Sequence, residues 1–241
     1  MKTFCRILEW DSQFFGRRIA RIESECLRRE STDEILAWAS KEQIDCLYFL
    51  SRPDDVESVA VAEELGFHLV DIRIELSWRL QEIPQSSITG VRRFQERDLP
   101  SLQRIASEIY TDTRFYYDQH FAPAQVAALY SEWLTKSCQT ETVFVVSDQG
   151  SLSSDDACGF ITCQFDHHGI GRIGLLGVGN QAKGKGHGHN LILAAQQYFQ
   201  TTGAAEVCVV TQGRNIAAQR LYQAHGFRTR SVALWYHKWF E

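Results

Sequence analysis

The alternation of apolar and polar residues along the chain predicts a mixture of helices and strands. Apolar residues recur at helical spacing in six segments, residues 33–41, 56–65, 98–110, 124–136, 188–201 and 216–224. Short apolar or alternating runs predict strands over residues 19–22, 46–50, 67–80, 91–94, 142–147, 157–166, 171–178, 206–211 and 231–240. Most connections are short, which favours antiparallel pairing. The pattern therefore predicts an α/β (α+β) fold.

A polar, turn-rich segment, EIPQSSITG at 82–90, separates two patterned regions. It predicts a small N-terminal α/β domain over residues 1–83, a linker over 84–90 and a larger domain over 91–241. Strand–helix–Gly–strand units at 45–80 and 206–240 have nearly equal spacing. They suggest an internal repeat, although such units are common enough to occur without one.

Composition and charge exclude several classes of protein. The chain has 241 residues, of which 44% are hydrophobic and 23% charged, as in ordinary soluble proteins. A net charge of −5 argues against nucleic-acid binding, and no apolar run approaches the ~18 residues of a membrane helix. Seven scattered cysteines without a CxxC pair predict reduced thiols, no metal site and a cytoplasmic location. The pair His167-His168 is expected at a solvated turn.

The most informative segment is LLGVGNQAKGKGHGHNLI at 175–192. A strand leads into a cluster of glycines and lysines, and a helix follows at once. Glycines allow a tight turn whose backbone N–H groups face a ligand at the positive end of a helix. The segment predicts a phosphate or pyrophosphate site, and it matches neither the Walker A nor the dinucleotide fingerprint. A flexible turn with solvated lysines is the alternative.

A second motif is NIAAQRLYQAHGF at 215–227. Asn215 is a typical helix N-cap, and Gly226 ends the helix. Ala218, Leu221 and Tyr222 share one helix face.

Together the two motifs resemble the GNAT superfamily of acyl-CoA-dependent N-acetyltransferases, over about residues 91–240. The resemblance implies a GNAT fold with a central mixed, largely antiparallel sheet flanked by helices, and acetyl-CoA as cosubstrate. It assigns the pyrophosphate loop to Lys183, Gly184, Lys185, Gly186, His187 and Gly188. An overlapping register that begins at Gln181 also fits, and would shift the contacts by two residues.

The same resemblance implies roles for residues near this loop. Backbone groups of Leu176 and Val178, beside a strand bulge, would bind the pantetheine arm. Asn215 would hold the arm or a bridging water. Tyr222 would be the catalytic general acid that protonates the departing CoA thiolate. The alternative for Tyr222 is an aromatic side chain that only packs its helix on the sheet.

The acceptor amine is indicated less directly. The strand 171–178 contains no Asp or Glu, so the general base lies elsewhere or the amine is already partly neutral, as on a sugar ring. The segments LEWDSQFFG, LGFHLVDIRIEL and DTRFYYDQHF resemble the dTDP-fucosamine acetyltransferase family. That family acetylates the 4-amino group of a dTDP-linked 4-amino-4,6-dideoxy sugar, a chemistry of polysaccharide biosynthesis.

This resemblance assigns substrate binding to the loop between the first two helices of the larger domain. Arg114 would bind a phosphate, Tyr116 and Tyr117 would stack, and Asp118 or His120 would bind sugar hydroxyls or the amine. The alternative is a loop that only fills the core. Two other functions stay open: a protein or peptide N-acetyltransferase with a carboxylate near Gly177, and a non-catalytic CoA-binding or partner-binding module. A homodimer is also open.

Overall fold

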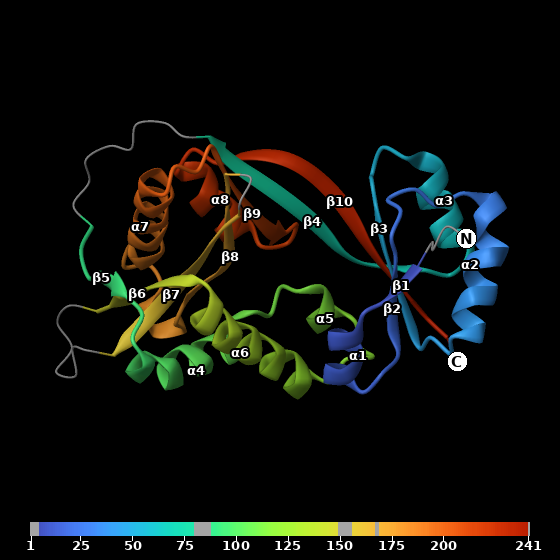
Figure 1. Ribbon diagram of the computed structural model, residues 1–241, viewed down its shortest axis with the longest axis horizontal. Helices are drawn as coiled ribbons and strands as arrows, with labels where there is room; N and C mark the ends of the chain where they lie inside the picture. Colours follow the sequence, from blue (N-terminus) through green and yellow to red (C-terminus); the bar gives the residue numbers. More distant parts are fainter. Residues whose placement is uncertain (1–4, 80–87, 149–155, 167–168, 241) are drawn as a thin grey trace.

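The computed structural model describes residues 5–79, 88–148, 156–166 and 169–240. Within these ranges, ten strands form one sheet in the order β1-β2-β3-β10-β4-β9-β8-β7-β6-β5 (Figure 1). The strands are β1 (Cys5–Ile7), β2 (Ile19–Ile22), β3 (Cys46–Ser51), β4 (His68–Arg79), β5 (Val91–Arg93), β6 (Thr142–Ser147), β7 (Ala157–Phe165), β8 (Ile170–Val178), β9 (Glu206–Gln212) and β10 (Arg228–Trp239). The helices are α1 (Glu9–Phe15), α2 (Arg29–Lys41), α3 (Val56–Glu64), α4 (Leu99–Ile109), α5 (Arg114–Tyr117), α6 (Pro123–Thr140), α7 (His187–Thr201) and α8 (Ile216–Ala224).

The sheet is mixed and largely antiparallel, which confirms the predicted fold class. Only the β2–β3 and β8–β9 pairs are parallel in the described part of the chain. Each of these pairs is joined by a helix, α2 or α7, as parallel connections require. Figure 1 shows α7 and α8 over one face of the C-terminal half, and α4 and α6 over the opposite face.

The two halves of the chain share their central strands. β4 precedes the predicted linker, yet it lies between β10 and β9 of the C-terminal half. Reciprocally, β10 ends the chain and pairs with β3 of the N-terminal half. The division at residues 84–90 and the internal repeat stay predictions, and most of that linker lies outside the described residues. The sheet itself is continuous across both halves.

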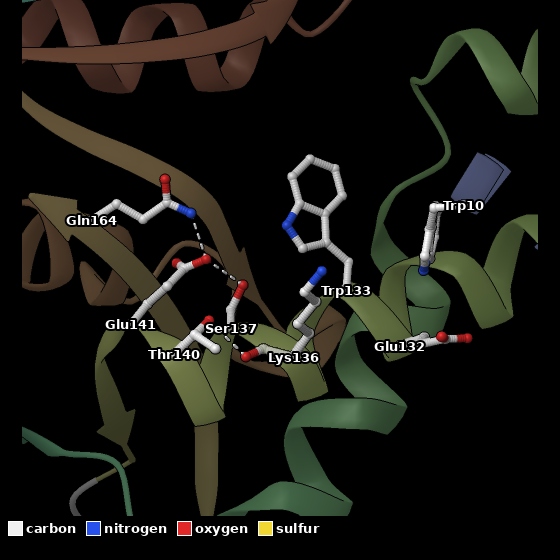
Figure 2. A pocket seen from close by; sticks show the side chains of 8 residues that line it. All are labelled: Trp10, Glu132, Trp133, Lys136, Ser137, Thr140, Glu141 and Gln164. Carbon is white, nitrogen blue, oxygen red and sulfur yellow. Dashed lines mark hydrogen bonds between the residues drawn. The ribbon is translucent and has the colours of Figure 1, made fainter. Parts of the chain in front are cut away.

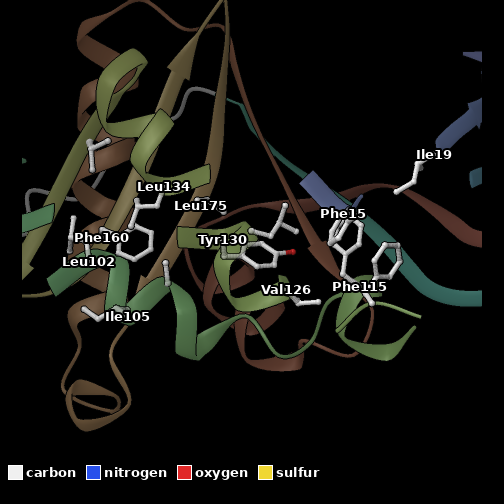
Figure 3. Close-up of a cluster of buried hydrophobic side chains, with 14 of the residues drawn as sticks. Phe15, Ile19, Leu102, Ile105, Phe115, Val126, Tyr130, Leu134, Phe160 and Leu175 are labelled. Atoms are coloured by element: carbon white, nitrogen blue, oxygen red, sulfur yellow. The ribbon is translucent and has the colours of Figure 1, made fainter. Parts of the chain in front are cut away.

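Successive residues of the inner strands face opposite sides of the sheet and belong to different cores. Val145 and Phe160 join a core under α1, α4, α5 and α6 (Figure 3), whereas Val146 and Ile161 join the core under α7 and α8. A third core packs α2 and α3 on the N-terminal strands. The α4/α6 face is thus covered by one core that extends over both halves.

Some element boundaries differ from the pattern-based ones. The helix predicted from residue 33 begins at Arg29, where Arg28 is held by Asp55 and Ser58 from a distant segment. The two short helices α1 and α5 and the strand β1 were not predicted, because elements this short carry too little periodicity.

Candidate active site

The parallel strands β8 and β9 separate at their carboxyl ends. They pair from Ile170 to Ile173 of β8, and beyond Val209 the strand β9 pairs only with β4. The last residues of β8, from Gly174 to Val178, pair with β7 on one edge and face a gap on the other edge, where β9 has separated. Such a gap gives a ligand access to unpaired backbone groups in the middle of the sheet.

A bulge in β8 accompanies this separation, as the sequence predicted. The β7–β8 register shifts between Ile161 and Cys163, so that two residues of β8 face Thr162 alone. The Leu175 N–H donates to Thr162 Oγ1 at 3.0 Å. A Cβ at Gly174 would lie 2.7 Å from the same oxygen, so the bulge needs glycine there.

Backbone groups of Leu176 and Val178 point into the gap. Gly177 faces Phe160 in the β7–β8 ladder, and its carbonyl is directed toward Gly159. Because backbone groups alternate along a strand, those of Leu176 and Val178 point away from β7. The Leu176 carbonyl accepts a hydrogen bond from the Tyr110 hydroxyl at 3.1 Å. The two residues assigned to the pantetheine arm therefore line the gap.

Tyr222 of α8 belongs to the buried core under α7 and α8. It is 4% exposed and packs on Phe227. Burial raises the pKa of the Tyr222 phenol, so it stays protonated at neutral pH and retains a proton to donate. Its proximity also contributes to the raised pKa of Tyr110, so the two phenols are neighbours. Asn215 caps α8, with Oδ1 accepting from the Ala218 N–H at 3.0 Å.

The glycine-rich loop has the backbone that the sequence predicted. Gly184 and Gly186 have φ angles of 80° and 82°, in the left-handed region that favours glycine. Gly186 is the N-cap residue of α7, and among the residues that the structure describes no side chain caps this helix end. The first N–H groups of α7 are thus free to bind an anion.

The remaining residues of the loop differ in their exposure and in their contacts. Lys183 and Gly184 are exposed, whereas Lys185 is paired with Asp148. His187 is buried, and its Nε2 has no hydrogen-bond partner among the described residues. Gly188 faces α8, because a Cβ there would lie 3.1 Å from Leu221 Cδ2. The absence of a side chain at Gly188 therefore allows α7 and α8 to approach closely.

A carboxylate from the N-terminal half lies beside the end of β9. Asp71 of β4 is 4% exposed, and its Oδ1 accepts from the Ile72 N–H at 2.8 Å and from Arg214 at 3.3 Å. Burial raises the pKa of Asp71 to about 6, although Arg214 partly opposes this effect. Its Oδ2 accepts no hydrogen bond from the described residues. The Tyr117 ring lies 3.9 Å from the Arg214 guanidinium, and Tyr116 is beside Tyr117.

Asp118 and His120 do not project into this gap. The Asp118 carboxylate is buried and accepts from His237 Nδ1 at 2.6 Å, Trp239 Nε1 at 2.9 Å and His120 Nδ1 at 2.7 Å. His120 stacks on Trp239 at the end of β10. In this structure the Asp118 carboxylate is paired with His120 and with His237 and Trp239 of β10, and its assignment to substrate binding stays a prediction.

Asp118 positions Arg114 through His237. Arg114 Nη1 donates to His237 Nε2 at 2.9 Å, so His237 must donate to Asp118 through Nδ1 and is a neutral imidazole. Burial accordingly lowers the pKa of His237 to about 4. The relay holds Arg114 over the Trp235 ring, 4.2 Å from its centroid.

A cavity of about 380 Å³ lies on the α4/α6 face, near the bulge (Figure 2). Figure 2 shows the tryptophans Trp10 and Trp133 on one side and the carboxylate of Glu141 on the other. Glu141 Oε1 accepts from Ser137 and Gln164, whereas Oε2 is buried and has no hydrogen-bond partner in the described part of the chain. A Cβ at Gly174 would lie 3.5 Å from Oε2. A second carboxylate thus approaches β8 from outside that strand.

Position 177 itself has no room for a side chain. A Cβ there would overlap Ile109 of α4 and lie 2.9 Å from the Phe160 ring. The carboxylate that a protein N-acetyltransferase was expected to carry near Gly177 is therefore excluded at that position.

Sequence reasoning missed Tyr110, Asp71 and Arg214. Tyr110 bonds the Leu176 carbonyl in the gap and Asp71 lies beside the end of β9, and both come from elements far from β8 in sequence, so no local spacing connects them with that strand. One signal was present for Asp71, an acidic residue at a buried position of an otherwise apolar strand segment, HLVDI.

A splayed parallel strand pair, a helix N-terminus with free backbone N–H groups and a buried tyrosine are the parts of an acyl-CoA-dependent acyltransferase site. The chain belongs to the acetyltransferase (GNAT) family, whose model matches residues 102–227. It is accordingly an N-acetyltransferase, as the sequence motifs predicted.

Two curated relatives show how far the similarity extends. The chain is 26% identical over 237 residues to the dTDP-fucosamine acetyltransferase of Escherichia coli O6:H1, covering 96% of both chains. It is 38% identical over 61 residues to the mycothiol acetyltransferase of Renibacterium salmoninarum, covering 25% of this chain and 18% of that protein.

Solved structures share the fold at low sequence identity. A GCN5-related N-acetyltransferase from Sphaerobacter thermophilus superposes with a TM-score of 0.67 at 14% identity, covering 98% of this chain and 76% of that one. A tandem GNAT protein from the clavulanic acid biosynthesis pathway gives a TM-score of 0.62 at 14% identity, covering 93% and 76%.

The described residues show neither a metal-binding group nor a membrane-spanning helix. No group of three or more His, Cys, Asp or Glu side chains is arranged to hold a metal ion there. Among the same residues, no helix is both long and apolar enough to cross a membrane. His167-His168 lies outside the described residues.

Proposed function

We propose that the protein transfers the acetyl group of acetyl-CoA to the 4-amino group of a dTDP-linked 4-amino-4,6-dideoxy sugar. The observation that carries this proposal is similarity over the whole length: 96% of this chain aligns with 96% of a dTDP-fucosamine acetyltransferase, including the N-terminal half. The site is consistent with it, because Asp71, a carboxylate from the N-terminal half, lies beside the end of β9 and is paired with Arg214 of the C-terminal half.

The C-terminal half forms the part of the gap that binds the acetyl donor, acetyl-CoA. The loop around Gly184 and Gly186 and the first turn of α7 bind the pyrophosphate of acetyl-CoA. Leu176 and Val178 hold its pantetheine arm with their backbone groups. A backbone N–H in this stretch stabilises the negative charge that develops on the thioester oxygen during attack.

Two side chains move the protons. As the amine nitrogen bonds to the acetyl carbon, Asp71 accepts a proton from the amine, directly or through one water molecule. The carbon–sulfur bond then breaks, and Tyr222 donates its proton to the thiolate. A carboxyl with a pKa near 6 is largely ionised at neutral pH, and a buried phenol is fully protonated, so each group starts in the required state.

A thiol-release assay tests the proposal. We expect CoA release with a dTDP-4-amino-4,6-dideoxyhexose, and none with peptides or polyamines. Thermal-shift measurements should show stabilisation by acetyl-CoA and, separately, by dTDP. Turnover confined to peptides would replace the proposal with a peptide N-acetyltransferase. Acetyl-CoA binding without turnover of any amine would indicate a CoA-binding module. The cytoplasmic location and the oligomeric state stay predictions.

A further inference from the structure

A groove of about 770 Å³ lies on the sheet face between the two halves. It is lined by side chains from β2, β3, β4 and β10 and by the loops that follow β2 and β3. Four of its lining residues are arginines, Arg21, Arg52, Arg73 and Arg230, against three acids. Arg52, Arg73 and Arg230 are paired with Asp54, Glu75 and Glu206, respectively.

Arg21 is the exception within this groove. Its guanidinium forms no ion pair with the described residues, and its buried Nε has no hydrogen-bond partner. The guanidinium carbon lies 5.2 Å from the centroid of the Trp235 ring, which also lines the groove. A half-buried arginine with unsatisfied donors is costly unless a ligand supplies the acceptor.

Arg114 reaches the same ring from α5. Its guanidinium carbon lies 4.2 Å from the Trp235 centroid, and its one hydrogen bond to a described residue goes to the neutral His237. Asp11 and Asp71 are close enough to interact electrostatically, but neither forms an ion pair with Arg114. The positive charge of Arg114 is therefore available to an anion.

Two unpaired guanidinium groups thus lie against one tryptophan ring. They repel one another, and burial together with Arg114 and Arg73 lowers the pKa of Arg21. A dianionic group between them relieves this repulsion and satisfies their forked donors, which match phosphate oxygens.

Arg21 and Arg114 lie on the side of the gap where Asp71 is proposed to receive the amine of the acceptor sugar. Trp235 faces Asp71 directly in the β10–β4 ladder, where opposite Cα atoms are about 5 Å apart. A ligand bound at Trp235 therefore extends naturally toward Asp71. The pyrophosphate loop for acetyl-CoA lies elsewhere, at the start of α7, so the two anion sites are separate.

We propose that Arg21 and Arg114 bind the diphosphate of the nucleotide-sugar substrate against Trp235, so that the N-terminal half holds the acceptor. This inference rests on the proposed function for the identity of the ligand. The shared chemistry is a diphosphate, and its two sources, the sugar nucleotide and acetyl-CoA, are distinguished by separate binding measurements.

Calorimetric titrations of the full chain with dTDP, inorganic pyrophosphate and acetyl-CoA test the proposal. Arg21→Gln should weaken dTDP and pyrophosphate binding about tenfold or more, since a hydrogen bond to a charged group is worth at least a factor of ten. Acetyl-CoA affinity should be unchanged. With the sugar nucleotide, KM should rise while kcat changes little, because binding is lost equally from the ground and transition states.

Two further variants keep the test interpretable. Arg114→Lys retains a charge among the aromatic rings, should keep the fold, and should weaken dTDP binding by losing the forked donor. Arg17→Gln, at an exposed arginine of the same half, should bind dTDP like the parent protein.

The outcomes separate this inference from the proposed function. If the parent protein binds and uses the sugar nucleotide but Arg21→Gln and Arg114→Lys do so equally well, the inference is overturned and the proposed function stands. If the parent protein does not use a sugar nucleotide but binds pyrophosphate in an Arg21-dependent way, the anion site stands and the proposed function falls. Arg21-independent binding of every diphosphate overturns the inference.

Discussion

The two halves of the molecule have the same strand order, but they differ in the residues at the places where a ligand could bind. Counting outward from the central β10–β4 pair, β3, β2 and β1 correspond to β9, β8 and β7, with parallel pairing at the same place in each half. The helices α3 and α8 are each capped by a side chain, Asp55 or Asn215, eleven residues before a left-handed glycine. Four residues before that glycine, the N-terminal half has Ala62 where the C-terminal half has Tyr222.

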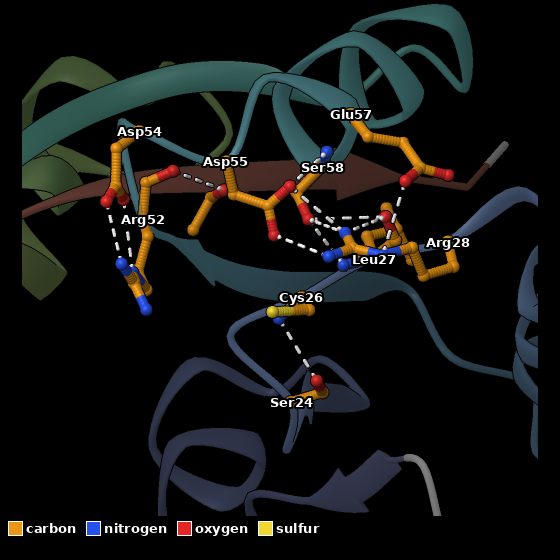
Figure 4. A network of polar contacts seen from close by, with 10 residues as sticks. Ser24, Cys26, Leu27, Arg28, Arg52, Asp54, Asp55, Glu57 and Ser58 are labelled. Carbon is orange, nitrogen blue, oxygen red and sulfur yellow. Dashed lines mark hydrogen bonds and ion pairs between the residues drawn. The ribbon is translucent and has the colours of Figure 1, made fainter.

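The loops that follow β2 and β8 differ most. In the N-terminal half, the loop before α2 is bonded to the start of α3 (Figure 4). Ser58 Oγ accepts from the Leu27 N–H at 2.8 Å and from Arg28 at 2.8 Å, and Arg28 also pairs with Asp55. In the C-terminal half, Gly184 and Gly186 occupy the corresponding loop. The N-cap residue of neither α2 nor α7 caps its helix with a side chain, so the difference lies in the loops: the one before α2 is bonded to Ser58 of α3, and the one before α7 contains left-handed glycines.

The comparison teaches that the fold provides the gap and a few residues decide its use. The loop that joins the two parallel strands carries a closed polar network in one half and the glycine-rich segment in the other. We expect substitutions in the open loop to act on binding and catalysis, and substitutions in the closed network to act on stability.

Gly186→Asp should have the largest effect. It places a side chain at a φ of 82° and a negative charge where the pyrophosphate binds, so we expect the Kd for acetyl-CoA to rise about 1000-fold or more. Gly16→Asp is the matched control in the N-terminal half, because Gly16 is also left-handed and a Cβ there meets nothing within 4 Å. Calorimetry measures both, and parent-like affinity of Gly186→Asp would show that the loop register is wrong.

Tyr222→Phe should lower kcat and kcat/KM together by about 100- to 1000-fold, in the lower half of the range for general-acid catalysis. The ring still packs on Phe227, so KM and the melting temperature should change little. Tyr198→Phe removes a hydroxyl on α7 that bonds Thr142 and should keep full activity. A parent-like kcat for Tyr222→Phe would leave water as the proton donor and Tyr222 as a packing residue.

Asp71→Asn should lower kcat/KM by at least about tenfold and change its pH dependence. Because the raised pKa of Asp71 is about 6, the carboxyl is protonated below that pH and cannot accept a proton. The parent rate should therefore fall as the pH drops through 6, and the variant should lack this limb. Glu141→Gln tests the other carboxylate near β8. If the acidic limb disappears in Glu141→Gln instead, Glu141 is the base.

Ser58→Ala should have the smallest functional effect. It removes the acceptor at the centre of the closed network and leaves the Leu27 N–H and Arg28 short of a partner. We expect a loss of about 1–3 kcal/mol in the free energy of unfolding, measured by urea denaturation. Acetyl-CoA affinity should not change. Thr32→Ala, at a partly exposed position of α2 whose hydroxyl donates only to the Arg29 carbonyl of the same helix, should stay within about 0.5 kcal/mol of the parent protein. Weakened acetyl-CoA binding by Ser58→Ala would contradict the separation of roles between the halves.

The parts of the site that were predicted from sequence are those whose meaning is local. The left-handed glycines at 184 and 186 and the cap at Asn215 depend on neighbours within a few residues. The surroundings of Gly188 and Asp118 could not be predicted in this way, because each contacts a partner from another element. Gly188 faces Leu221 of α8, and Asp118 accepts from His237, 119 residues away in sequence.

Local spacing and backbone preference were enough to indicate an anion-binding loop at a helix N-terminus, and the resemblance of the two motifs to a known superfamily implied the class of enzyme. The roles of the loop residues and of Tyr222 stay predictions. Local spacing could not indicate that β4 would lie beside β9, since strand order depends on which apolar faces pack together over the whole chain. That arrangement brings Asp71 to the gap and places Arg21 and Arg114 at one tryptophan ring. Residues that meet across such a sheet share no spacing in the sequence, so their common chemistry becomes visible only in the folded chain.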